Sequence, residues 1–291
     1  TESGFIAMNI ITIEGDKTHG KAVFDENQQS VNFDGEFVSW KTGDIAIEWT
    51  FDSRISEDLI KAEIVSGPLT LIILALVFGS IVAAFLPIGV GIATVAAAMG
   101  MTIWLSNVTD VTQYATNIIT LIGIGVSIDY SLFLVNRFRE ELAIGRDVRT
   151  AVAMSTATAG KAVFFSGITV AIGLMGMLFF KNTSLPSLGI GGTVAVSIAM
   201  VYSTIVLPAV MSILGKRVDK GKVPFAFNLE AREDGLWANI ANKVMAHPWK
   251  VLIPVLILLV GAGAPFLYAE FSLSSWSALP PDDESRLGKE M

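Results

Sequence analysis

Two long stretches without a charged residue are the feature that most constrains what this chain can fold into. No Asp, Glu, Lys or Arg occurs between Glu63 and Asp110, and none occurs between Lys161 and Lys181. A membrane-spanning helix needs about 20 mainly apolar residues, so the first stretch has room for two spans, with a turn predicted at Pro87, and the second has room for one. Only 16% of all residues are charged and 52% are hydrophobic, which is too few charges for a soluble protein of this size. The sequence therefore predicts a polytopic α-helical membrane protein.

Six spans are predicted in total. They lie at about residues 66–85, 87–106, 115–137, 162–180, 187–214 and 250–268. The uncharged run of residues 182–215 is long for one helix and short for two, and Pro186 and Pro208 are both able to break it. With a single span there, which Pro208 only kinks, the basic loops all fall on one side of the membrane, and the positive-inside rule makes that side the cytoplasm. The basic residues of these loops are Arg137, Arg139, Arg146, Arg149, Lys161, Lys216, Arg217, Lys220, Lys222, Arg232, Lys243 and Lys250.

This topology divides the chain into five regions. Residues 1–60 and 270–291 lie outside the cell, residues 61–215 hold five spans, residues 216–247 form a cytoplasmic linker, and residues 248–269 hold the sixth span. Residues 1–60 show neither a signal peptide nor a preceding span that would export them, so we expect at least one helix upstream, in a longer membrane protein. In the linker, "DGLWANIANKVMAHPW" places Leu236, Trp237, Ile240 and Val244 on one side, which is typical of a helix lying at the cytoplasmic membrane surface.

The outside segment is expected to be the end of an α/β domain. "FIAMNIITIE" is apolar on both faces and predicts a buried strand, while "DIAIEWTF" alternates apolar and polar residues from Ile45 to Phe51 and predicts a half-buried strand. Ser56, followed by two acidic residues, is the predicted N-cap of a helix. That helix is predicted to continue without a break into the first span.

Other chemistry is largely excluded. The chain has no cysteine, so thiolate catalysis, disulfides and cysteine zinc sites are ruled out. His19 and His247 are predicted on opposite sides of the membrane and cannot share a metal, and no GxxxxGK[ST] phosphate loop occurs. The glycine-rich pieces "GIGV", "LPIGVGI" and "LGIGG" are interpreted as sites of close helix contact, with Gly123 and Gly125 packing near Asp129. We expect no enzymatic activity, no bound metal and no nucleic-acid partner.

Asp129 stands out by elimination. It is the only acid within any predicted span, eight positions before Arg137, and so near the middle third of the bilayer. An ionised aspartate at a helix centre costs roughly 2.5–3.5 kcal/mol on insertion scales, unless water, a partner or a proton relieves it. Relief is expected from protonation, or from a hydrogen bond donated by Tyr130 or by a tyrosine on another helix. A titrating carboxylate here indicates a proton-coupled machine, while a plain interhelical hydrogen bond remains the alternative.

The residues also carry a resemblance to a known family. Four segments in this order, "EDLIKAEIVSGPLTLIILALVFGSIVAAFLPIGVGI", "GIGVSIDYSLFLVNRFREEL", "TATAGKAVFFSGITVAIGLMGMLFF" and "HPWKVLI", resemble the mycobacterial-membrane-protein-large (MMPL) family of the resistance-nodulation-division (RND) superfamily. The resemblance runs from about Ser56 to the end of the chain. It implies that the chain covers the end of a first porter domain, spans two to six, span seven and the start of a second porter domain.

The resemblance implies a function and a site. Members of the family are proton-driven exporters of lipids or other hydrophobic molecules, with the proton gradient in place of a cofactor. Their relay pair on span four falls on Asp129 and Tyr130, and a second Asp–Tyr pair, on a span beyond this sequence, faces the first. Ser166 and Thr169 are candidate polar neighbours on the adjacent span, although both are equally able to bond their own helix backbone.

Three alternatives and one open question accompany this interpretation. A Sec-type export accessory protein shares the six-span halves, but its motif fits less well than "IDYSLFLVNRFREE". A Patched-like sterol-sensing receptor shares the architecture without the proton dependence. An intramembrane aspartyl protease needs two carboxylates, and the predicted spans supply one. Assembly into a homo-oligomer is left open.

Overall fold

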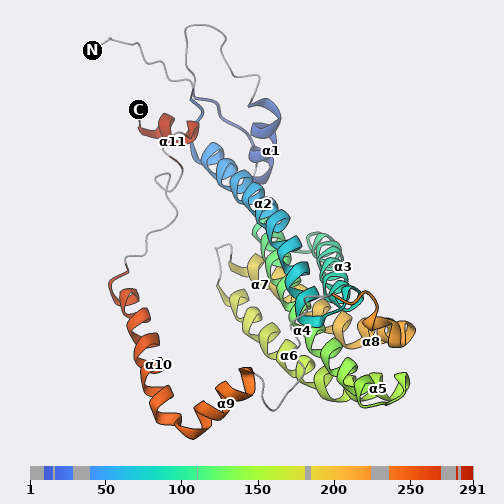
Figure 1. Ribbon diagram of the computed structural model, residues 1–291. Helices are drawn as coiled ribbons and strands as arrows, with labels where there is room; N and C mark the ends of the chain where they lie inside the picture. Colours follow the sequence, from blue (N-terminus) through green and yellow to red (C-terminus); the bar gives the residue numbers. More distant parts are fainter. Residues whose placement is uncertain are drawn as a thin grey trace. The chain divides into compact units, whose positions relative to one another are not determined.

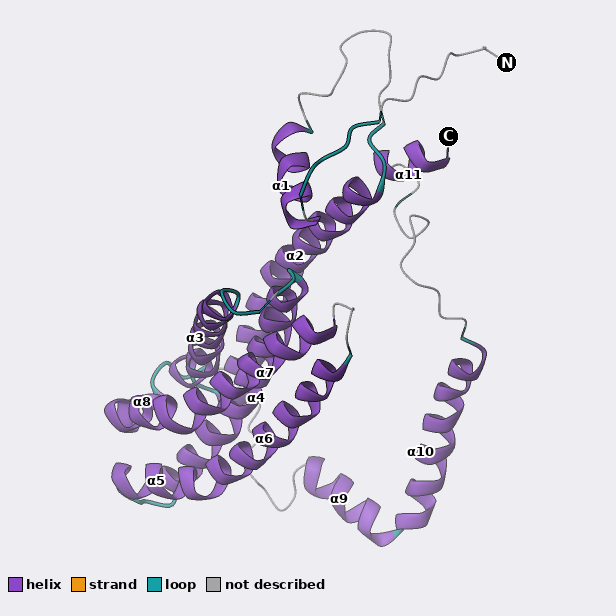
Figure 2. Ribbon diagram, turned by 180° about the vertical axis from the view of Figure 1, so that it is seen from behind, coloured by secondary structure: helices purple, strands orange, loops and turns teal. Residues whose placement is uncertain are grey.

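A computed structural model describes residues 10–15, 17–28, 40–109, 111–180, 185–223, 236–269, 280 and 283–290. Every regular element within these ranges is helical (Figure 1, Figure 2). Contacts divide the chain into two compact units, one of residues 1–60 and 242–291 and the other of residues 61–241. The two units are described separately below.

Helices long and apolar enough to cross a membrane match the six predicted spans. Their bounds are Asp44–Phe78, Ile81–Leu105, Tyr114–Ala143, Val148–Phe179, Leu185–Asp219 and Pro248–Tyr268. The described part of the uncharged run, from Leu185 onward, belongs to one span, as the loop charges indicated. The chain is therefore a multi-pass helical membrane protein.

The first unit is built on the start of α2 (Asp44–Phe78), against which α1 (Lys17–Asn27) packs. The ring of Phe24 meets Trp49 edge to face with 5.6 Å between centroids, and Lys21 Nζ lies 2.7 Å from Asp52 Oδ2. Burial lowers the pKa of Lys21, but hydrogen bonds to Asp52 and Glu48 outweigh it and leave the pKa above its ordinary value. The same unit contains α10 (Pro248–Gly263), η5 (Ala264–Tyr268) and α11 (Glu284–Glu290).

The strand predictions in this segment are wrong. The residues from Ile45 to Phe51 form the first turns of α2, and Ser56 lies inside that helix instead of capping it. Residues 10–14 of "FIAMNIITIE" have no regular structure, and residues 5–9 lie outside the described ranges. The predicted continuity is confirmed, because α2 runs without a break from Asp44 into the first span.

The second unit is a helical bundle. Its members after α2 are α3 (Ile81–Leu105), α4 (Tyr114–Ala143), α5 (Val148–Ser155), η1 (Thr156–Gly160), α6 (Lys161–Met175), η2 (Gly176–Phe179), α7 (Leu185–Val201), η3 (Tyr202–Val206), α8 (Leu207–Leu214), η4 (Gly215–Asp219) and the start of α9 (Leu236–Ala246). The helices α3, α4 and α7 pack against one another, and α6 packs against α7. Helix α9 confirms the helical pattern predicted for the linker.

The turn between the first two spans lies at Gly79–Ser80, so the prediction of a turn at Pro87 is wrong. Gly79 has φ of 64°, which favours glycine, and Ser80 caps α3 by accepting a hydrogen bond from the Ala83 N–H. Pro87 lies inside α3, where the cost of its missing N–H is tolerated in a packed membrane bundle. The stretch without charged residues shows where the pair of spans begins and ends. It does not show where the turn between them lies.

Glycines allow the central helices to approach closely, as predicted for "LGIGG". A Cβ added at Gly191 on α7 would lie 2.7 Å from the Ala115 carbonyl oxygen on α4, and one at Gly189 would lie 2.9 Å from the Leu174 carbonyl oxygen. Small residues at such contacts let helix backbones come together. The position of α4, and hence of Asp129, depends on the contact at Gly191.

Candidate functional site

Helix α4 carries Asp129 at its midpoint, 15 residues after Tyr114 and 14 before Ala143. The carboxylate lies on an exposed stripe of α4 together with Leu121, Gly125 and Phe133. Within the part of the chain that the structure describes, Asp129 forms no ion pair and no side-chain hydrogen bond. The structure thus places an acid at mid-membrane depth with neither a cation nor a donor among these residues.

Tyr130 points in a different direction from Asp129. Its side chain is only 7% exposed and belongs to the buried core of the bundle. Consecutive helix residues point about 100° apart, so the two side chains cannot face each other. The hydrogen bond that the sequence suggested between them is accordingly not formed.

A small pocket lies beside Tyr130, between α4 and the helix formed by η1 and α6. Its volume is about 150 Å³, and its lining residues are Tyr130, Phe133, Ala159, Ala162, Val163 and Ser166. The structure therefore brings the predicted neighbour Ser166 to Tyr130, whereas Asp129 does not line the pocket. Thr169 is exposed and its hydroxyl donates to the Phe165 carbonyl oxygen at 2.9 Å. It bonds its own helix backbone, which is the second of the two roles that the sequence left open.

The two glycines predicted to pack near Asp129 behave differently. A Cβ added at Gly123 would lie 3.4 Å from Val95 on α3 and 3.6 Å from Ala195 on α7, so this position faces the centre of the bundle. Gly125 is exposed, and a Cβ there would meet nothing within 4 Å. Of these two glycines, only Gly123 lies where it supports a packing role.

Sequence reasoning missed a set of buried hydroxyls on the opposite side of α4 from Asp129. Ser127 on α4 and Thr94 on α3 are fully buried, and their hydroxyl oxygens have no hydrogen-bond partner among the described residues. The hydroxyls of Ser131 and Ser203 are 3.4 Å apart. Ser203 lies in the π-helical segment η3, which contacts the other π-helical segment, η1. π-Helical segments are rare in proteins overall, but many of those that occur lie at functional sites. The composition of this sequence gives no signal for them.

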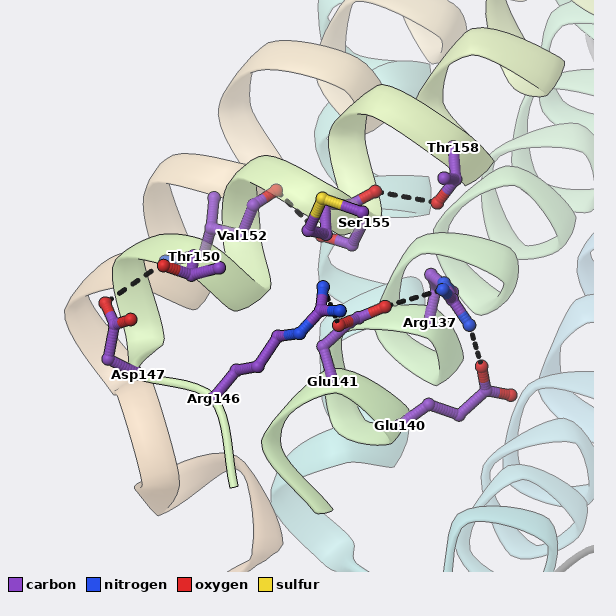
Figure 3. Close-up of polar contacts among 10 residues, drawn as sticks. Arg137, Glu140, Glu141, Arg146, Asp147, Thr150, Val152, Ser155 and Thr158 are labelled. Atoms are coloured by element: carbon purple, nitrogen blue, oxygen red, sulfur yellow. Dashed lines mark hydrogen bonds and ion pairs between the residues drawn. The ribbon is translucent and has the colours of Figure 1, made fainter. Parts of the chain in front are cut away.

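Sequence reasoning also missed a charged cluster at the end of α4 (Figure 3). Helix α4 continues six residues past its predicted end at Arg137, so Asp129 is not the only acid of this span. Glu141 is 1% exposed and lies 2.6 Å from both Arg137 Nη2 and Arg146 Nη1. Arg137 also donates to Glu140 at 2.8 Å. The signal was present in the spacing of Arg137 and Glu141 four residues apart, which places them on one face of a helix.

Asp147 begins the helix that follows this cluster. Its carboxylate accepts a hydrogen bond from the Thr150 N–H and caps α5. The hydrogen bonds from Thr150 hold the pKa of Asp147 below its ordinary value. The predicted cytoplasmic loop after the third span is therefore mostly helical.

The described residues contain no group of three or more His, Asp or Glu side chains able to hold a metal ion. What the arrangement offers chemically is a titratable carboxylate at the middle of a bundle helix, next to a buried tyrosine and a small apolar pocket. That combination suits proton uptake and release better than bond-making chemistry, which needs a nucleophile with a base or a pair of carboxylates.

Comparison with known proteins assigns the chain to a family. A model of the MMPL family matches residues 40–251. The mycolic acid-containing lipids exporter MmpL11 of Mycolicibacterium smegmatis is 36% identical over 79% of this chain and 24% of its own length. The trehalose monomycolate exporter MmpL3 of Mycobacterium tuberculosis is 33% identical over 81% of this chain and 28% of its own length. A putative membrane protein of Streptomyces coelicolor, SCO6666, is 33% identical over 98% of this chain and 40% of its own length. The chain thus spans about a quarter to two fifths of the length of these relatives, and it belongs to the MMPL family.

Proposed function

We propose that this chain is part of a proton-driven exporter that moves lipids or other hydrophobic molecules across or out of the cytoplasmic membrane. The single observation that carries the proposal is Asp129, an acid at the midpoint of α4 with no cation and no hydrogen-bond donor among the described residues. Family membership and two relatives that are named as lipid exporters support the substrate class. Asp129 is the group that takes up and releases the proton. Tyr130, the second member of the relay pair that the family resemblance implies, does not contact Asp129 and faces the pocket that Ser166 lines.

The energetics favour a titrating role over a structural one. An ionised aspartate at a helix centre costs roughly 2.5–3.5 kcal/mol, whereas a neutral side chain at the same position costs far less. A purely structural aspartate would offset this cost with a local hydrogen bond or ion pair. None is present within the described ranges, so the cost of the charge is removed by binding a proton. The side from which water reaches Asp129 determines when the proton binds and when it leaves.

The proposed topology places residues 1–60 and 270–291 outside the cell. Contacts within the first unit support a common side for the two segments, because Thr42 donates to the Ser285 carbonyl oxygen at 2.9 Å and Arg54 lies 3.5 Å from Asp283. A cysteine at Ala143 should be reached by an impermeant thiol reagent only from the cytoplasm, and a cysteine at Asn107 only from outside. Labelling of both from one side would contradict the topology.

Asp129→Asn in the full-length protein tests the function. Asparagine keeps the shape and hydrogen-bonding capacity of aspartate and removes the titration. The variant should insert, fold and bind substrate, and should lose export driven by an imposed pH gradient in reconstituted vesicles. Tyr130→Phe should weaken export less completely. Asp129→Leu serves as the comparison: if asparagine preserves gradient-driven export while leucine lowers thermal stability, Asp129 is structural and the proposal is wrong.

A further inference from the structure

Three elements meet at Arg139, ten residues beyond Asp129 on the same helix. The Arg139 Nε donates a hydrogen bond to Asp219 Oδ1 at 2.6 Å, and Asp219 is the last residue of η4. The guanidinium carbon of Arg139 also lies 5.7 Å from the centroid of the Phe78 ring, within the range of a cation–π contact. Phe78 is buried and is the last residue of α2. One side chain thus joins α4, α2 and the segment that follows α8.

That segment is tied to the start of α3 as well. The Ser80 hydroxyl lies 2.8 Å from the Val218 carbonyl oxygen and 2.9 Å from that of Lys220, and it can donate to one of them at a time. The Ile81 N–H donates to the Gly221 carbonyl oxygen at 3.0 Å. Because the first N–H groups of a helix have no partner within the helix, this carbonyl completes the N-terminus of α3. We call residues 218–223 the strap.

The strap fits closely because of one glycine. Gly221 has φ of 77°, and a Cβ there would lie 3.1 Å from Ile81 Cβ. The Val223 N–H returns a hydrogen bond to the Gly79 carbonyl oxygen at 3.2 Å. The strap therefore holds the turn between α2 and α3, and Arg139 connects this turn to the helix that carries Asp129.

We propose that Arg139 is a positioning residue that couples the protonation of Asp129 to movement of α2. The inference rests on the proposed function of Asp129. Helix α2 is continuous from Asp44 to Phe78, so displacement of Phe78 is carried along the helix. At 1.5 Å per residue, Arg139 lies about 15 Å along α4 from Asp129, and a tilt or rotation of α4 moves the guanidinium together with Phe78 and Asp219. Without Arg139, only apolar packing between Phe78 and the core of the bundle connects α4 to α2 at this end.

Hydrogen exchange in the purified full-length protein tests the link without any assumption about transport. Arg139→Gln removes the ion pair and the cation–π contact, and should speed exchange of the Ile81 amide about tenfold by loosening the strap. Asp219→Asn should act in the same direction to a smaller extent. Glu140→Gln is the matched control, because the partner of Glu140 among the described residues is Arg137, which lies on the same helix. Unchanged exchange at Ile81 in the Arg139 variant would overturn the link.

Reconstituted vesicles then test the coupling. Arg139→Gln should lose at least about fivefold in gradient-driven export per folded protein while Asp129-dependent proton uptake persists, and the double variant Arg139→Asp with Asp219→Arg should recover part of the export. A merely structural Arg139 predicts that export falls only in proportion to folded protein, and that result would overturn the coupling. The proposed function is tested separately. If the Asp129→Asn variant retains export, the proposed function is wrong, whatever result the Arg139 variants give.

Discussion

Gly191 is the position where a single methyl group should have the largest effect on the bundle. In Gly191→Ala the new Cβ lies 2.7 Å from the Ala115 carbonyl oxygen, 3.0 Å from the Ala115 Cα and 2.9 Å from Ile118 Cγ2. Two of these three atoms belong to the backbone of α4, so no rotamer change relieves the contact. Carbon atoms pack best at about 3.5–4.0 Å, and α4 and α7 must therefore move apart by roughly 0.5–1 Å.

The magnitude follows from two opposing effects. Overpacking of this kind costs about 1–3 kcal/mol, and backbone contact places Gly191→Ala at the upper end. Replacing glycine by alanine inside a helix returns about 1 kcal/mol. The net loss is about 2 kcal/mol of unfolding free energy. Gly100→Ala on α3 is the matched control, since its Cβ meets nothing within 4 Å and it keeps only the gain.

Equilibrium unfolding of the full-length protein in mixed detergent micelles measures both variants. The two should differ by about 3 kcal/mol, more than a hundredfold in the unfolding equilibrium constant. The separation of α4 from α7 should also lower gradient-driven export, because it displaces the helix that carries Asp129. Equal stability of the Gly191 and Gly100 variants would refute the close contact between these helices.

Three further predictions concern α4 and the start of α5. Glu141→Gln should lower the unfolding free energy by about 2 kcal/mol, which is less than the roughly 3–5 kcal/mol for a fully buried pair because its arginine partners are partly exposed. The control Glu140→Gln should change the unfolding free energy by under about 0.5 kcal/mol. Thermal unfolding of the two variants measures the difference. The pKa of Asp147 is lower in the folded protein than in the unfolded chain, so its stabilisation is complete above the unfolded pKa and is lost as pH falls through the folded pKa. An Asp147→Ala variant should therefore have a lower thermal unfolding temperature than the parent protein at neutral pH, and this difference should disappear at acid pH. Gly125→Leu should abolish export if another helix covers the exposed stripe around Asp129, and unchanged expression and export would show that this stripe meets lipid.

The number of spans could be predicted because it depends on charge, which is read directly from the sequence. The length of a stretch without charged residues, such as that from Glu63 to Asp110, fixes how many spans it can hold, and this does not depend on how the helices pack. The turn inside the gap could not be placed, since Ser80 depends on carbonyl groups of Val218 and Lys220, which are remote in sequence. The alternation from Ile45 to Phe51 misled for a similar reason. The same residues also suit a helix, in which Ile45 and Trp49 share the face that α1 covers.

The candidate site was predictable in position and not in orientation. Asp129 is found from its isolation among apolar residues, and its depth follows from counting along α4. Which way it points depends on which face of α4 the bundle buries, and that is decided by contacts such as the one between Gly191 and Ala115. Glu141 escapes prediction because the apolar run ends at Arg137, whereas the helix continues to Ala143. The spacing of four residues between Arg137 and Glu141 is the signal that the sequence does carry.

The two π-helical segments, Thr156–Gly160 and Tyr202–Val206, have a consequence for how this family can vary. A π-turn closes its hydrogen bonds over five residues where an α-turn uses four, so each segment holds one residue more than a regular helix needs to connect the same two ends. Deleting a single residue there converts the turn to α-helix and leaves the helix on either side in register. Elsewhere in these spans the same deletion rotates all following side chains by about 100°. Length differences of one residue between related chains should therefore accumulate at these two segments, the first of which lines the pocket beside Tyr130, and be excluded from α4.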